Sequence, residues 1–130
     1  MPNLTSQQAN KLANNFLALA QSVGEYRYTH YSDLSPDENQ QLKNYHWSIL
    51  NCSDDLFTLS ANLIIEDVET SLNSISEITN QIKGTYQDLQ NVQKAINVAT
   101  SVVTLGAAIV SKNPQAIADS ISGLVESWNE

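Results

Sequence analysis

The sequence predicts an all-α protein, an antiparallel up-down four-helix bundle with coiled-coil-like seams, and three observations support this prediction. First, apolar residues recur at every seventh position, with others three or four residues away, a spacing typical of helices packed lengthwise and foreign to strands. Second, only four Gly and three Pro interrupt 130 residues, which favours a few long elements. Third, helix-capping signals stand at the expected starts. The heptad series consists of Val68, Ile75, Ile82, Leu89, Ile96, Val103 and Val110.

The first helix is expected at about residues 6–31. Thr5 or Ser6 can cap its N-terminus. Gly24 lies within its apolar face and weakens the helix by roughly 1 kcal/mol relative to Ala, which that face can tolerate. The apolar face is formed by Ala9, Leu12, Phe16, Leu19, Val23 and Tyr26, and His30 continues it.

The second helix is expected at about residues 36–66, and its start carries the clearest local signal in the chain. Ser35 can cap it, Pro36 is a favoured first residue, and Glu38 completes a capping box. Its apolar series ends at Leu63, and the heptad series that follows is two residues out of step. Because that offset turns the apolar face by roughly 200°, we expect a break between about residues 64 and 70.

The third helix is expected at about residues 68–111. Gly84 marks the point where it would kink or break, since Gly commonly follows a helix C-terminus. The heptad series crosses Gly84 in phase, however, so we predict one continuous helix. At ~1.5 Å per residue it would be roughly 65 Å long. Such a helix would overhang its neighbours unless the chain folded at Gly84 or a second chain covered it, and this mismatch in length favours a homo-oligomer or a complex.

The last helix is expected at about residues 114–128. The residue before a proline avoids the helical conformation, so Pro114 separates this helix from the third, and Asn113 can cap it. Its apolar face is formed by Ile117, Ile121, Leu124 and Trp128. All four helices are expected to belong to one domain, residues 1–130.

The charge of the chain narrows the range of partners. Six basic and fourteen acidic residues give a net charge of −8, whereas a nucleic-acid interface needs a positive surface. We expect no nucleic-acid binding, and a basic protein would be attracted. Cys52 is the single cysteine, and the N-terminus lacks the basic and apolar segments of a signal peptide. We expect a cytoplasmic protein, and one secreted without a leader would have the same sequence.

No residue pattern indicates a catalytic, cofactor-binding or metal site, so we predict a non-enzymatic protein without cofactors. His30 and His46 are the only histidines, and they fall several turns apart on different predicted helices. A di-iron bundle carries Glu-x-x-His on two helices, whereas Arg27 and Lys43 stand three residues before these histidines.

Aromatic residues around the first predicted turn form a candidate interaction surface, consisting of Tyr28, Tyr31, Tyr45 and Trp47. Aromatic side chains with a polar group are enriched at protein interfaces. Packing at the end of the bundle is the simpler explanation for most of them. Tyr28 and Trp47, however, fall off the apolar faces, and this is the patch we expect to be a contact surface.

Residues 95–111 carry no charge and permit two interpretations. The run is shorter than the ~20 apolar residues that span a bilayer, so burial among the other helices is the first. The second is a membrane-inserting hairpin of residues 95–128, similar in general outline to the hydrophobic hairpins of helical pore-forming toxins. The candidate helix–helix or membrane-active segment is Ala99, Val103, Gly106 and Val110.

The sequence therefore predicts a non-enzymatic module for protein–protein interaction or self-assembly, such as a regulatory, immunity-type or assembly subunit. The overlong third helix, the aromatic patch and the absence of a catalytic pattern favour this function. The alternative is a membrane-active helical bundle that inserts the 95–128 hairpin.

Overall fold

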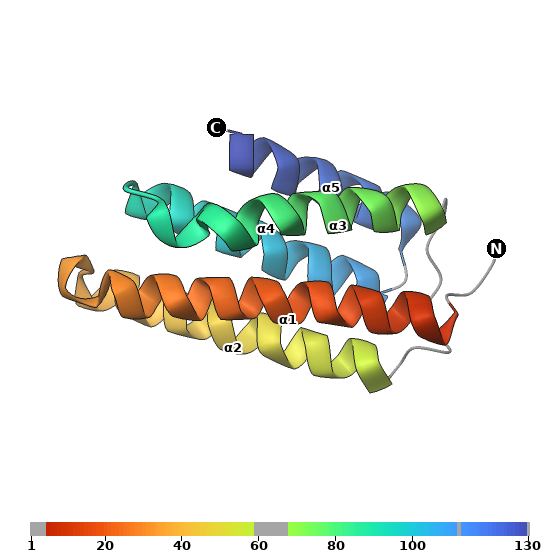
Figure 1. Ribbon diagram of the computed structural model, residues 1–130, viewed down its shortest axis with the longest axis horizontal. Helices are drawn as coiled ribbons and strands as arrows, with labels where there is room; N and C mark the ends of the chain where they lie inside the picture. Colours follow the sequence, from red (N-terminus) through yellow and green to blue (C-terminus); the bar gives the residue numbers. More distant parts are fainter. Residues whose placement is uncertain (1–4, 59–67, 112, 130) are drawn as a thin grey trace.

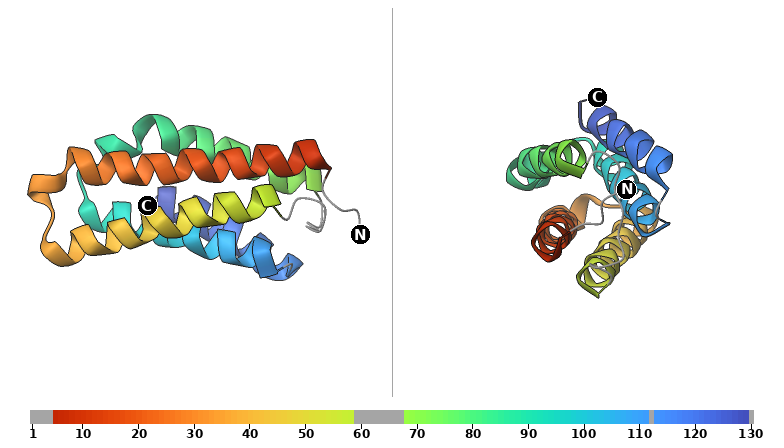
Figure 2. Two further views of the ribbon diagram at one scale, coloured as in Figure 1. Left: turned by 90° about the horizontal axis from the view of Figure 1, so that it is seen from below. Right: turned by 90° about the vertical axis from the view of Figure 1, so that its right-hand side faces the viewer.

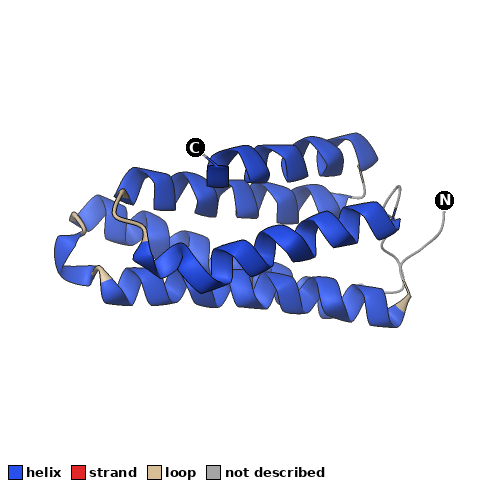
Figure 3. Cartoon of the chain, turned by 45° about the horizontal axis from the view of Figure 1, so that its top comes forward, coloured by secondary structure: helices blue, strands red, loops and turns tan. Residues whose placement is uncertain are grey.

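The computed structural model describes residues 5–58, 68–111 and 113–129, and these residues are all-helical (Figures 1 and 3). The predicted all-α class is confirmed, but the described residues form five α-helices rather than four. The elements in order are α1 (Ser6–Thr29), η1 (Tyr31–Asp33), α2 (Pro36–Thr58), α3 (Val68–Thr85), η3 (Tyr86–Asp88), α4 (Val92–Ser111) and α5 (Pro114–Asn129), where η1 and η3 are single 3-10 turns.

Successive helices run in opposite directions along the long axis of the molecule (Figure 1). Their neighbours in space differ from their neighbours in sequence. α1 packs against α2 and α3, α2 packs against α4, and α4 packs against α5, which makes a lighter contact with α3. In the end view, α1 and α2 lie on one side of the bundle, and α3 and α5 lie on the other (Figure 2). All five helices contribute to one cluster of buried apolar side chains.

The predicted capping signals start the helices as expected. The Thr5 hydroxyl accepts the backbone N–H of Gln8 at 3.1 Å, and the Gln8 side chain accepts the N–H of Thr5 at 2.9 Å. Ser35 and Glu38 make the same reciprocal pair at 3.1 and 2.8 Å. The side chain of Asn113 accepts a backbone N–H of the first turn of α5 at 3.2 Å. These bonds satisfy N–H groups that have no partner within a helix.

The helix boundaries agree in part with the prediction. α1 ends at Thr29 rather than residue 31, and α5 ends at Asn129 rather than residue 128. α2 is described to Thr58 and α3 begins at Val68, the expected start of the third helix. The predicted end of the second helix at residue 66 and most of the expected break lie outside the described residues.

The continuous helix predicted over residues 68–111 is wrong. α3 ends one residue after Gly84, η3 follows, and α4 begins at Val92. The start signal that the prediction passed over is Asn91, whose side chain accepts the backbone N–H three residues on at 3.1 Å. Leu89 lies outside a helix, in the turn, but it still packs partly against the core. For this reason the apolar residues keep their seven-residue spacing across the turn.

Tyr86 holds this turn against the C-terminal end of α1. Its buried ring meets the ring of Tyr26 edge-on, with centroids 5.2 Å apart, and its hydroxyl donates to the Ala95 carbonyl at 2.5 Å. Nearby, the His30 ring donates from Nε2 to the backbone oxygen of Gln87 at 2.8 Å. Packing with distant segments therefore outweighs the heptad continuity that favoured one helix.

The fold-back removes the overhang that supported self-association. α3 and α4 have 18 and 20 residues, against 24 in α1. At ~1.5 Å per residue they are roughly 27 and 30 Å long beside a helix of roughly 36 Å. The mismatch in length therefore gives no reason to expect a second copy.

α1 and α2 are joined by polar contacts at every seventh residue. The contacts are Ser53 Oγ to the Ala13 carbonyl at 2.9 Å, His46 Nδ1 to the Ala20 carbonyl at 2.7 Å, and Arg27 Nε to Asn39 Oδ1 at 2.7 Å. Positions 13, 20 and 27 of α1 thus face positions 53, 46 and 39 of α2. Each step of seven residues along α1 matches a step of seven back along α2. The three contacts therefore specify the antiparallel register, and they position His46 and Arg27.

Candidate functional site

Three of the four aromatic residues in the predicted interaction surface are exposed. Tyr28 near the end of α1 is 86% exposed, Tyr31 in η1 is 62% exposed, and Trp47 in α2 is 53% exposed. Tyr45 differs, because it is half-buried and packs against the core. We call Tyr28, Tyr31 and Trp47 the aromatic surface.

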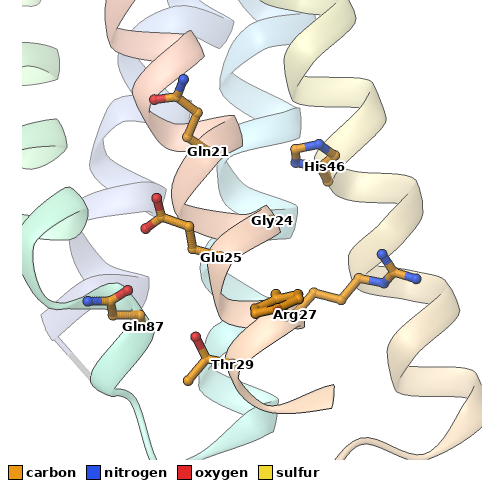
Figure 4. A pocket seen from close by; sticks show the side chains of 8 residues that line it. Gln21, Gly24, Glu25, Arg27, Thr29, His46 and Gln87 are labelled. Atoms are coloured by element: carbon orange, nitrogen blue, oxygen red, sulfur yellow. The ribbon is translucent and has the colours of Figure 1, made fainter.

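A hollow of about 640 Å³ lies on the outer side of α1, next to the aromatic surface. We call it the Gly24 groove; it is lined by Gln21, Gly24, Glu25, Arg27, Tyr28, Thr29, His46 and Gln87. In Figure 4, Gly24 of α1 lies between His46 on α2 and Gln87 on η3. The α1–α2 register and the η3 turn therefore build the groove together.

Gly24 leaves the space that His46 occupies. A Cβ atom at position 24 would lie 2.8 Å from Cε1 and 2.9 Å from Nδ1 of His46, closer than real side chains approach. The ring is held there by its hydrogen bond to the Ala20 carbonyl. The residue that weakens α1 by propensity is thus needed where α1 and α2 approach each other.

His46 and Glu25 present hydrogen-bond acceptors in the groove. A carbonyl oxygen only accepts, so Nδ1 of His46 carries the hydrogen, and Nε2 of the neutral ring is an acceptor. Nε2 makes no hydrogen bond to the described residues and is not buried. Glu25 is exposed, and its carboxylate forms no ion pair within the described ranges.

Arg27 is the one cationic residue that lines the groove. Its Nε donates to Asn39 at 2.7 Å, and its guanidinium lies toward α2 (Figure 4). Glu25 points from the opposite side of α1 in the same view. The charge of Arg27 is therefore directed away from the carboxylate.

The groove gathers hydrogen-bond acceptors, and none of the described residues near it forms a metal-ligand cluster. Where the structure describes the chain, no three His, Cys, Asp or Glu side chains gather as metal ligands. Burial and the nearby Asp55 carboxylate raise the pKa of the Cys52 thiol to about 11, so it is protonated at neutral pH and a poor nucleophile. No hydroxyl or thiol of the described residues is hydrogen-bonded to Nε2 of His46.

The predicted helix–helix or membrane-active residues of α4 lie partly in the core and partly at its edge. Ala99 and Gly106 are buried, whereas Val103 and Val110 are half-buried. A Cβ at position 106 would lie 2.6 Å from Sγ of Cys52, so Gly106 lets α4 approach α2. By length and composition α4 could cross a membrane, since an 18-residue stretch of it has a mean hydropathy of 1.4. In the folded protein, 50% of that stretch is buried.

The sequence pointed to the aromatic residues but not to the groove beside them. The groove members it missed are Gln21, Gly24, Glu25, Arg27, Thr29, His46 and Gln87. One signal was present in the sequence. A glycine interrupts an apolar helix face one turn before the most exposed aromatic residue.

Two of the three residues of the aromatic surface, Tyr28 and Trp47, adjoin the Gly24 groove. The surface and the groove share Tyr28, and the ring of Trp47 lies edge-on to the ring of His46 with centroids 5.6 Å apart. Comparison of the chain with protein-family models, with curated proteins and with solved structures finds no match.

Proposed function

We propose that this protein is a non-enzymatic interaction module that binds another protein through the aromatic surface and the adjoining Gly24 groove. One observation carries the proposal. Within the described residues four large hydrophobic side chains are exposed, and three of them form the aromatic surface. Tyr and Trp supply much of the binding energy in protein interfaces, and a cluster beside a hollow is typical of a contact site.

The net charge supports a basic partner rather than a second copy of the chain. At −8 the protein attracts a cationic surface over a distance of about one Debye length, ~8 Å at physiological salt, and speeds its association. A second copy carries the same charge and is repelled. A regulatory, immunity-type or assembly subunit that binds a basic protein fits this balance.

Site-specific photo-crosslinking tests the proposal. Tyr31 is replaced by p-benzoylphenylalanine and the protein is irradiated in a lysate of its native source, with Asn97 on the exposed side of α4 as the control position. We expect one protein to be crosslinked at position 31 and not at 97, and the adduct to be lost when Tyr28 and Trp47 are replaced by Ala. Loss of a central aromatic residue costs roughly 2 kcal/mol or more, about 30-fold in affinity. Equal labelling at both positions, or none, would refute the proposal.

A second candidate function is membrane activity, and the length and composition of α4 favour it. This helix has 20 residues, and an 18-residue stretch of it has a mean hydropathy of 1.4. If it inserts into lipid, a charge in its middle should block insertion at a cost of roughly 3 kcal/mol. Dye release from neutral liposomes at pH 7 and pH 5 tests this, with Thr104→Asp on the exposed side as the variant. An intact protein that releases no dye at either pH is not membrane-active.

A further inference from the structure

We infer that the Gly24 groove binds a guanidinium group, supplied by an arginine side chain of the partner. The inference rests on the proposed function and specifies the chemistry of the partner at that site. It follows from the acceptors in the groove, from the aromatic ring beside them and from the direction of Arg27, which points away from the Glu25 carboxylate.

The acceptors match a donor-rich ligand. The Glu25 carboxylate forms no ion pair among the described residues, and in Figure 4 it lies on the same side of α1 as Gln21 and Gln87, whereas His46 lies on the other side. Side-chain amides of Gln21 and Gln87 add two more oxygens to the lining. Guanidinium carries five N–H donors and no acceptor, so it pairs with this set, whereas an anionic ligand would be repelled by Glu25.

The ring of Tyr28 offers a face on which a planar cation can stack. Tyr28 lines the groove and is 86% exposed, so its ring is open to a ligand. A cation over an aromatic face gains roughly 0.5–1 kcal/mol at exposed sites, and the flat guanidinium also stacks. The chain uses this chemistry internally, since Nζ of Lys94 lies 5.4 Å from the centroid of the Trp128 ring.

The groove's own cation is directed away from the Glu25 carboxylate (Figure 4). Arg27 is the one basic residue in the lining, and its Nε is bonded to Asn39 at 2.7 Å on the α2 side. The overall charge of −8 then draws a basic ligand toward the protein.

The test is a titration of the ¹⁵N-labelled full chain with N-acetyl-arginine amide, followed by two-dimensional NMR. We expect chemical-shift changes concentrated on the amides of residues 21–29 and of His46, with a dissociation constant on the order of 1 mM, as ligands of this size reach. N-acetyl-citrulline amide, a neutral analogue of the same shape, and N-acetyl-lysine amide should each bind about 5- to 10-fold more weakly.

A matched pair of variants locates the site. Glu25→Gln, on the exposed side of α1, should weaken the arginine derivative about 5- to 10-fold. Glu77→Gln, an exposed carboxylate on α3, removes the same charge and should leave the affinity unchanged. Equal binding of arginine and citrulline derivatives, equal effects of the two variants, or shifts elsewhere on the protein would each overturn the inference.

The inference and the proposed function fail separately. If photo-crosslinking at position 31 captures a partner but the arginine derivative does not bind the groove, the interaction module stands and the guanidinium site is rejected. If the arginine derivative binds as expected but position 31 captures nothing, the guanidinium site stands. The proposal that the aromatic surface binds a protein is then rejected.

Discussion

Replacing Tyr26 by Phe should stabilise the protein, whereas the same replacement of Tyr86 should destabilise it. The two tyrosines lie edge-on to each other, and both are buried, with exposures of 0% and 1%. They differ in one respect. The hydroxyl of Tyr26 has no hydrogen-bond partner among the described residues, while that of Tyr86 donates to the Ala95 carbonyl at 2.5 Å.

The magnitudes follow from the cost of a buried polar group. An unsatisfied buried hydroxyl costs roughly 1–3 kcal/mol, so its removal in Tyr26→Phe should raise the free energy of unfolding by that amount. A satisfied hydrogen bond contributes about 1 kcal/mol, which Tyr86→Phe should lose. For a chain of 130 residues, about 2.1 cal/mol/K per residue converts 1 kcal/mol into about 4 °C of Tm.

Urea unfolding followed by circular dichroism, together with thermal unfolding, measures both variants against the parent. We expect the Tm of Tyr26→Phe to rise by roughly 4–12 °C and that of Tyr86→Phe to fall by roughly 4 °C, with unchanged m-values. A loss of stability in Tyr26→Phe would refute the reasoning, because the hydroxyl would then have a partner such as an ordered water molecule.

Three further predictions concern the core around α2. Stability should fall as the pH rises above about 9, because burial raises the pKa of Cys52 from 9.0 to about 11 and raises the pKa of both buried tyrosines from 10.0, so the unfolded chain ionises first. Cys52 alone accounts for roughly 2–3 kcal/mol between pH 9 and 11; urea unfolding of Cys52→Ala should show the decline only above about pH 10, and an identical pH profile would contradict this. Gly106→Ala should cost roughly 1–3 kcal/mol because the new Cβ would lie 2.6 Å from Sγ of Cys52, and adding Cys52→Ala should restore most of that loss; a double-mutant cycle without coupling would contradict this contact. Ser53→Ala should cost about 1 kcal/mol in urea unfolding more than the exposed Ser48→Ala, because it removes the bond to the Ala13 carbonyl, and equal effects would show that this bond contributes little.

Local signals predicted the helix starts. A capping residue and its partner stand three positions apart in the chain, as Thr5 with Gln8 and Ser35 with Glu38, so the sequence contains the whole interaction. The heptad spacing likewise predicted the all-helical class. The cap at Asn91 is equally local, but the uninterrupted heptad series concealed it.

The candidate site was predictable only in part. Tyr28 and Trp47 are exposed, and they are the two aromatic residues that fell off the predicted apolar faces. Tyr45, in contrast, packs against the core. The acceptors of the Gly24 groove could not be predicted, because Glu25, His46 and Gln87 lie in separate segments that meet only after α2 and η3 pack against α1.

The sequence by itself determined that this protein is helical, where most of its helices begin, and that its net charge is −8, because periodicity, capping and composition are properties of short segments or of the whole chain. Only the tertiary structure decided the number of helices and the shape of the candidate site. The burial of Tyr86 against Tyr26 replaces the predicted continuous helix by a turn, and the packing of α2 and η3 against α1 brings His46 and Gln87 to the groove. Both depend on side chains that are distant in sequence, whose contact energies no local pattern contains.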